Sequence, residues 1–187
     1  MRIIAGQQRG RKLFALEGDQ VRPTSDRVKE ALFNILQFQI EGRRFLDLFA
    51  GSGQIGLEAL SRGADEAVFV DFSKKSIAVI EKNLETVGLS AKAQVYNADS
   101  TMFIGRTADK FDVAFLDPPY STSLLNETLP LVAAAMNGGG VIVCEHPSTE
   151  ILPESAGDFQ KVKFYRYGKI CLTQYRNILA SERMDRE

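Results

Sequence analysis

The fold of this chain is decided by the stretch Arg44-Phe45-Leu46-Asp47-Leu48-Phe49-Ala50-Gly51-Ser52-Gly53. Its apolar part predicts a buried strand, and the glycines that follow predict a sharp turn. Apolar residues at helical spacing begin directly after the turn, at Ile55, and continue to Leu60. In α/β folds a strand, a glycine turn and a helix bring backbone N–H groups close to a ligand, because glycine permits close approach and a positive φ. The stretch therefore predicts an α/β fold with a ligand site at the turn.

The same alternation of strands and helices continues along the chain. Besides residues 44–49, we expect strands at residues 67–71, 93–96, 111–116 and 141–144, helices at residues 77–87 and 124–136, and a turn at residues 138–140. Alternating apolar and polar residues on both sides of Gly168, at residues 161–167 and 170–176, predict an antiparallel hairpin. We therefore expect a mostly parallel seven-stranded sheet that is covered by helices on both faces and closed by this hairpin.

The N-terminal part of the chain is basic. Residues 1–22 predict a short β-hairpin arm, and residues 23–187 predict one domain that begins with an amphipathic helix. On this helix we expect Arg27 and Lys29 to lie away from the apolar stripe. If the substrate is a polyanion, these cations and those of the arm could contact its phosphates. The cations of the first thirty residues are Arg2, Arg9, Arg11, Lys12, Arg22, Arg27 and Lys29.

Composition excludes several classes of protein. The 187 residues, of which 44% are hydrophobic and 25% charged, fit one globular domain with one core. The net charge of −1 argues against a protein that coats nucleic acid by bulk attraction. No apolar run approaches the roughly 20 residues that span a bilayer, and the first residues turn polar too early for a signal peptide. We therefore expect a cytoplasmic protein without membrane contact, and nothing requires more than a monomer.

The cysteines and the single histidine carry no clear chemistry. Cys144 and Cys171 lie far apart in apolar runs, so we expect two reduced core residues and no metal site. His146 precedes a proline, and we expect it in a surface turn rather than in catalysis. Whether the neighbouring Glu145 lines a substrate pocket is left open.

Four acids follow the pattern of the predicted strands. Asp47 lies just before the glycine turn, and Asp71, Asp99 and Asp117 end or follow the next three strands. In an open parallel sheet, ligands bind beyond the carboxyl ends of the strands. The glycine spacing together with Asp71 also fits a dinucleotide-binding fingerprint, so a nucleotide dehydrogenase is a rival. No hydride-transfer constellation or second substrate domain supports that rival.

The stretch Asp117-Pro118-Pro119-Tyr120 predicts a small site rich in hydrogen-bond acceptors, with one flat wall. Such a site suits a planar ring that carries an amino group. Asp117 can accept one amine hydrogen, a carbonyl beside the prolines can accept the other, and Tyr120 can stack on the ring. Taken alone, the four residues are equally compatible with a strand that ends in a proline turn.

Together these motifs resemble a known class of enzymes. Asp47 to Gly53, Asp71, Asp99 and Asp117 to Tyr120 are similar to the S-adenosylmethionine-dependent amino methyltransferases, which have a Rossmann-like fold. The segments Arg22–Leu36 and Gly56–Ala64 resemble, more narrowly, the RsmD family. That family methylates the N2 amine of a guanine in bacterial 16S ribosomal RNA. The resemblance covers nearly the whole chain.

The resemblance implies a role for each residue of the motifs. Asp117, the carbonyl of Pro118 and Tyr120 are implied as catalytic residues that hold the guanine amine and stack on the base, which must be unstacked from its surroundings. The implied RNA contacts are Tyr120 and the N-terminal residues Arg22, Thr24, Arg27 and Lys29. The implied S-adenosylmethionine site has Asp47 at the glycine turn and the methionine amine, Gly51 and Gly53 beside the cofactor, Asp71 at the ribose with Phe72 next to it, and Asp99 at the adenine amine with Ser100 nearby.

Two other functions remain open. A DNA methyltransferase acting on adenine N6 or cytosine N4 would use the same four-residue motif, but the chain has little room for a target-recognition domain. A non-catalytic RNA-binding assembly factor could retain the fold without the reaction. The substrate is either free RNA or a partly assembled small ribosomal subunit, and the near-neutral charge favours the particle.

Overall fold

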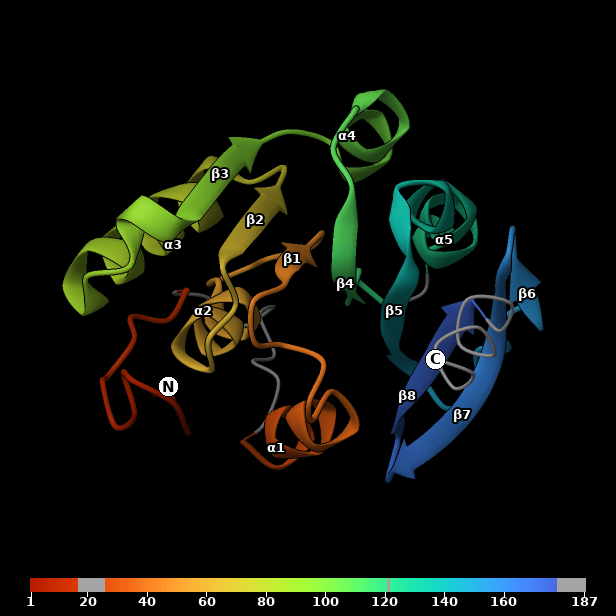
Figure 1. Ribbon diagram of the computed structural model, residues 1–187, viewed down its shortest axis with the longest axis horizontal. Coiled ribbons are helices and arrows are strands. Elements are labelled where there is room, and N and C mark those ends of the chain that lie inside the picture. The colour runs from red at the N-terminus through yellow and green to blue at the C-terminus, as the bar shows by residue number, and fades with distance from the viewer. Residues whose placement is uncertain (17–25, 121, 178–187) are drawn as a thin grey trace. The chain divides into compact units, whose positions relative to one another are not determined.

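The computed structural model describes residues 1–16, 26–120 and 122–177, and the chain forms two compact units, Met1–Ser100 and Thr101–Glu187 (Figure 1). The N-terminal arm belongs to the first unit. Its predicted hairpin is reduced to one antiparallel bridge, between Arg2 and Lys12, within residues 1–16. The remainder of the predicted arm, residues 17–22, lies outside the described residues, and the single domain from residue 23 stays a prediction.

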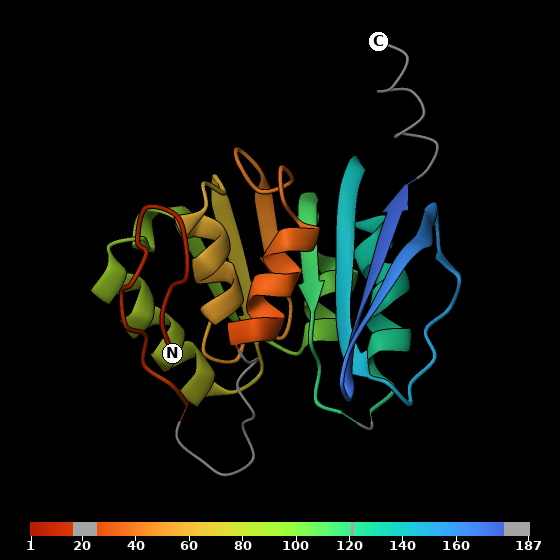
Figure 2. The same cartoon turned by 90° about the horizontal axis from the view of Figure 1, so that it is seen from below.

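The first unit is built on three parallel strands, β1 (Arg44–Asp47), β2 (Glu66–Asp71) and β3 (Ala93–Asn97), with β2 in the middle. Its helices are α1 (Asp26–Ile35), α2 (Gln54–Ser61), α3 (Lys74–Val87) and the short η1 (Ser90–Lys92). Every residue of α2 is buried, because the helix packs against β1 and β2 on one side and beneath the arm on the other. Figure 2 shows α2 and α3 in front of these strands. The predicted strand, turn and helix from residue 44 are thereby confirmed.

The second unit contains β4 (Phe111–Leu116), α5 (Leu124–Ala134), β5 (Met136–Pro147), β6 (Ser155–Ala156), β7 (Phe159–Tyr167) and β8 (Ile170–Asn177). The helix α4 (Ser100–Arg106) leads into it. Strands β4 and β5 are parallel, and β5, β8, β7 and β6 follow in antiparallel order. A mostly parallel α/β arrangement with a C-terminal antiparallel hairpin is therefore confirmed.

Two local expectations were wrong, and one helix was missed. The structure has eight strands in its described residues, since the two-residue β6 pairs with β7 and has no pattern that a sequence could reveal. The helix α4 was not predicted. The glycines at residues 138–140 form no turn between elements: β5 already pairs with β4 at Met136, and the register then jumps to Val141, so the intervening residues form an irregularity within the strand.

The core confirms that both cysteines are buried. Cys144 and Cys171 are buried among the strands of the second unit, and neither is part of a disulfide. Burial raises the pKa of both thiols, so they remain protonated and chemically inert near neutral pH.

Within the described parts of the chain, no helix is long and apolar enough to cross a membrane.

Candidate active site

The glycine turn after β1 leaves its backbone open to a ligand. Gly51 and Gly53 have φ values of +54° and +76°, which a residue with a side chain rarely adopts. A Cβ atom at Gly51 would have no neighbour within 4 Å, so the space beside this backbone is free. The turn closes through a hydrogen bond from Gly53 N to Ala50 O at 2.7 Å and leads directly into α2. These features fit the approach of an extended ligand to the backbone.

Two of the predicted acids hold this turn in place. Asp47 is buried, and its Oδ2 accepts a hydrogen bond from Gly56 N in the first turn of α2 at 3.0 Å. Asp71 accepts from Gly51 N at 2.9 Å through Oδ2 and from Ser73 N at 2.8 Å through Oδ1. The resemblance implied that Asp47 positions the turn; in the structure Asp47 accepts a hydrogen bond from the start of α2, and Asp71 accepts one from the turn itself. Each carboxylate oxygen has a second lone pair, so Asp71 retains capacity to bind a hydroxyl group.

The next predicted residues surround the ends of β2 and β3. Phe72 is 72% exposed and presents an aromatic ring directly after β2. Asp99 is exposed, whereas Ser100 is buried and donates a hydrogen bond to the carbonyl of Leu48 at 2.9 Å. Ser100 therefore holds the residue that follows β1. An exposed ring after β2 and an exposed carboxylate after β3, the neighbouring strand, are groups that suit a nucleoside.

Two residues that support this region were missed. Asn97 Nδ2 donates to the carbonyls of Asp71 and Phe72, at 3.1 and 2.8 Å. Asn83 is fully buried on α3, and its Nδ2 donates to Ser52 O in the glycine turn at 3.0 Å and to Phe14 O in the arm at 3.1 Å. Its Oδ1 accepts from Phe14 N at 2.7 Å. An asparagine in the apolar stripe of a helix is the signal that could have revealed Asn83.

In the second unit the predicted amine-binding residues follow β4. Asp117 is half-buried, Pro118 is buried, and Tyr120 is 41% exposed. The hydroxyl of Tyr120 donates to Oε1 of Glu145, at 3.4 Å. Glu145 lies near the end of β5 and is only 3% exposed. The motif thus ends in a partly exposed ring whose hydroxyl group contacts a buried carboxylate.

Lys29, one of the predicted RNA contacts, lies in the interior and not on the surface. Its side chain is fully buried, its Nζ donates to Arg2 O at 2.6 Å, and it forms an ion pair with Glu58 at 3.6 Å. Burial lowers the pKa of Lys29, and the Glu58 charge opposes that effect. A phosphate cannot reach Nζ in this arrangement, so the prediction for Lys29 was wrong. Arg27 is exposed, as expected, while Arg22 and Thr24 lie outside the described residues.

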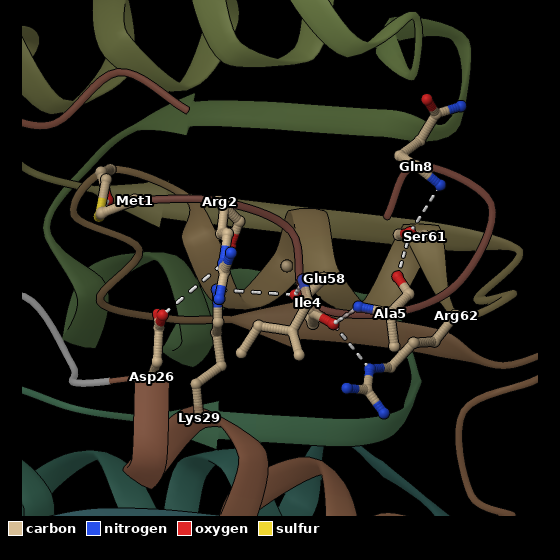
Figure 3. A network of polar contacts seen from close by, with 12 residues as sticks. Met1, Arg2, Ile4, Ala5, Gln8, Asp26, Lys29, Glu58, Ser61 and Arg62 are labelled. Atoms are coloured by element: carbon tan, nitrogen blue, oxygen red, sulfur yellow. Dashed lines mark hydrogen bonds and ion pairs between the residues drawn. The ribbon is translucent and has the colours of Figure 1, made fainter. Parts of the chain in front are cut away.

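Glu58 is the centre of the network that binds the arm to the first unit (Figure 3). Its carboxylate accepts from the backbone of Ile4 and Ala5, at 2.8 and 2.9 Å, and from Arg62 Nε at 2.9 Å. On the same helix, Ser61 Oγ donates to Ala5 O at 2.6 Å. Two cations and two amides therefore satisfy one buried carboxylate, and the arm is fixed along α2.

The expectation for His146 was also wrong. The residue belongs to β5 and is buried, with Nε2 2.8 Å from Thr173 Oγ1 and Nδ1 3.1 Å from Pro147 O. Burial lowers the pKa of His146, so the ring is neutral near pH 7. Among the residues that the structure describes, no group of three or more histidine, cysteine or acidic side chains could hold a metal ion.

Comparison with known proteins identifies the family. The model of the family described as Conserved hypothetical protein 95 matches residues 1–176. Ribosomal RNA small subunit methyltransferase D from Haemophilus influenzae is 44% identical over 135 residues, which cover 71% of this chain and 70% of that protein. YlbH from Bacillus subtilis is 40% identical over 181 residues, or 94% of this chain and 98% of that one.

Solved structures agree with this family. The structure of yhhF from Escherichia coli has a TM-score of 0.85 and 35% identity, and covers 95% of this chain and 97% of its own. An RNA methyltransferase from Salinibacter ruber in complex with S-adenosyl-L-homocysteine has a TM-score of 0.64 at 14% identity, covering 82% and 92% of the two chains, so it shares the fold. The fold is therefore that of the Rossmann-like S-adenosylmethionine-dependent methyltransferases. The chain belongs to the family described as Conserved hypothetical protein 95, which is the RsmD family that its sequence resembles.

Proposed function

We propose that this protein transfers a methyl group from S-adenosylmethionine to the exocyclic N2 amine of a guanine in 16S ribosomal RNA. Family membership supports methylation of ribosomal RNA, since curated members are named for that activity. The observation on which the choice of an amine rests is the motif after β4, with a half-buried Asp117, a buried Pro118 and a partly exposed Tyr120. Its substrate would place the protein in the bacterial cytoplasm.

The first unit suits the cofactor by its open glycine turn, its exposed aromatic ring and its acids at strand ends. S-adenosylmethionine, when bound, supplies a methyl group that its sulfonium already activates. Asp71 would accept hydrogen bonds from the ribose hydroxyls with the lone pairs that Gly51 and Ser73 leave free. The residues that would hold the cofactor are Asp47, Gly51, Gly53, Asp71, Phe72, Asp99 and Ser100.

The chain's contribution to the reaction is orientation. The lone pair of the guanine amine is delocalised into the ring, so the amine is a poor nucleophile. Hydrogen bonds from its two hydrogens to Asp117 and to the carbonyl of Pro118 would favour a tetrahedral nitrogen and direct the lone pair at the methyl group. Tyr120 would stack on the base and exclude water. Transfer would then be direct, without a covalent enzyme intermediate; the donor would leave as S-adenosylhomocysteine, and the methylated nitrogen would release its extra proton to water.

RNA binding would use cations on the surface of the first unit. Arg27 and the arm residues Arg2, Arg9, Arg11 and Lys12 are exposed, and Arg22 and Thr24 remain part of the proposal. Lys29 is no longer part of the proposed RNA contacts, because it is buried. With a net charge of −1, bulk attraction contributes little, which favours a partly assembled subunit in which ribosomal proteins add contacts.

Two rival functions are separated by one experiment. The purified protein is incubated with labelled S-adenosylmethionine and three substrates from cells that lack the gene: 16S RNA, partly assembled small subunits, and duplex DNA. We expect label in N2-methylguanosine of the RNA, with the particle preferred over free RNA. Label in N6-methyladenine or N4-methylcytosine of the DNA would favour a DNA methyltransferase. Binding of RNA without transfer of label would favour an assembly factor.

A further inference from the structure

We propose that Glu145 selects guanine at the target position by accepting the hydrogen of its ring nitrogen N1. This inference rests on the proposed function and deepens it, because it states how the same site distinguishes guanine from other bases that carry an amine.

The first observation is the register of β4 and β5. These parallel strands pair Leu116 with Cys144, and Asp117 and Glu145 follow directly after this pair. In neighbouring parallel strands, residues at the same level lie side by side. The acid that would hold the amine, directly after β4, and a second acid, within β5, therefore lie at the same level of adjacent strands.

The second observation is what surrounds Glu145. It is 3% exposed, lies opposite Leu172 on β8, and has Tyr165 one strand further at the same level. Its Oε1 accepts the hydroxyl hydrogen of Tyr120, the residue that would stack on the base. A carboxylate in such surroundings loses much of its hydration. Hydrogen bonds from donors that replace the lost water are therefore strong.

Base chemistry decides what such a carboxylate can recognise. On the Watson–Crick edge of guanine, the N2 amine and N1–H are adjacent donors. Beside the amine of adenine or cytosine lies a ring nitrogen that presents a lone pair. With the amine on Asp117, a second carboxylate next to it attracts N1–H of guanine and repels the lone pair of either other base. A site built to bind an N–H group rejects analogues that lack it by large factors, up to about 10⁴–10⁵.

A purely structural role for Glu145 would be to orient the Tyr120 hydroxyl. The two roles differ in one measurable quantity, the preference between two substrates that share the N2 amine and differ at N1. Replacing the target guanosine by 2,6-diaminopurine riboside keeps that amine, turns N1 into an acceptor and exchanges O6 for an amino group. Because the exchange at C6 is the same for every protein variant, a change of preference between variants reports on N1. The substrate for the test is the particle or RNA that wild-type protein methylates best.

The wild-type protein is expected to methylate the guanine substrate at least about 100-fold faster than the diaminopurine substrate, measured as kcat/KM. In Glu145→Gln the side-chain amide can accept from N1–H or donate to an acceptor. We expect a loss of about 10- to 100-fold on guanine and a preference reduced by about tenfold or more. The control Tyr120→Phe removes the hydroxyl contact and leaves the carboxylate; its kcat falls, and its preference stays at the wild-type value.

Several outcomes would overturn the inference. An unchanged preference in Glu145→Gln would do so, as would an equal change in Tyr120→Phe, which would assign Glu145 to orientation of the tyrosine. If Glu145→Gln does not fold, the wild-type ratio decides alone, because equal rates on both substrates exclude a reader of N1–H. A protein that methylates no guanine at all overturns the proposed function, and this inference with it.

Discussion

Two regions of the molecule contain buried carboxylates and use them differently. In the first unit, Glu58 is enclosed by two amides of the arm and by the cations Lys29 and Arg62, and no part of it reaches solvent. In the second unit, Glu145 is also buried, but the residues beside it are Asp117, which is half-buried, and Tyr120, which is 41% exposed. The comparison teaches that two buried carboxylates differ in their neighbours: Glu58 is held by cations and amides that are internal to the fold, whereas Glu145 lies beside residues that are themselves partly exposed.

The largest expected effect is on stability, in Glu58→Ala. The substitution leaves Lys29 buried without its ion-pair partner and removes the acceptors of Ile4 N and Ala5 N. Removing one partner of a buried pair costs about 3–5 kcal/mol. We expect that loss in the free energy of unfolding by chemical denaturation. Adding Lys29→Met should recover part of it, and a loss below about 1 kcal/mol in the single variant would contradict the structural role.

Asp117→Ala should have the opposite profile, with a large loss of activity and a small loss of stability. Removing one transition-state hydrogen bond costs about 10²–10³-fold in kcat, and we expect the loss of this half-buried side chain to cost about 1 kcal/mol of stability. Methyl transfer at saturating cofactor and S-adenosylmethionine affinity by calorimetry should be measured separately. Lost cofactor affinity with normal turnover would place Asp117 in the cofactor site and contradict its proposed role at the amine.

Asn83→Ala should affect both stability and cofactor binding. It removes the hydrogen bonds to Phe14 in the arm and to Ser52 O in the glycine turn. Buried polar groups left unpaired cost about 1–3 kcal/mol each. We expect reduced unfolding free energy together with weaker S-adenosylmethionine binding, because the turn loses a support. Asn83→Asp keeps the acceptor for Phe14 N and loses both donated bonds, so normal cofactor affinity in that variant would exclude a role at the turn.

Arg27 and Lys29 provide a matched pair of substitutions for testing which cations contact RNA. Arg27 is exposed and Lys29 is buried on the same helix. If Arg27 contacts a phosphate, Arg27→Ala should reduce the slope of log binding constant against log salt by about 0.7–0.9. Lys29→Met should leave that slope unchanged. Equal slopes in all three proteins would remove Arg27 from the RNA surface, and a reduced slope in Lys29→Met alone would show that Lys29 becomes accessible when RNA binds.

The smallest expected effect is the dependence of stability on pH through His146. Burial lowers its pKa in the folded state below the ordinary value of 6.5, so the unfolded chain takes up the proton first as the pH falls. Its contribution to stability is therefore complete above pH 6.5 and is lost as the pH falls through the folded-state pKa. The unfolding free energy of His146→Gln should fall less steeply than that of the wild type over this range. A steeper fall would contradict a buried neutral ring.

Local signals revealed most of the elements and the positions of the acids that follow the strands. The glycine turn, the acids at strand ends and the hairpin around Gly168 follow from patterns within a few residues, and the structure has all of them. The predicted turn at residues 138–140 was wrong. Three glycines favour a turn locally, but in the structure they form an irregularity in the pairing of β4 with β5. The predicted exposure of Lys29 was wrong because Glu58, the partner that allows its burial, lies on a different helix.

The sequence by itself determined an α/β fold with a glycine turn and a strand followed by Asp117-Pro118-Pro119-Tyr120, because strand periodicity, glycine conformation and motif spacing are local properties, and its motifs resembled those of the methyltransferases. Only the tertiary structure decided which charged and polar groups are buried. It placed Lys29 inside, coupled Asn83 to the glycine turn and brought Glu145 to Tyr120. The physical reason is that the cost of removing a charge or an amide from water depends on partners that are distant in sequence and adjacent only after folding.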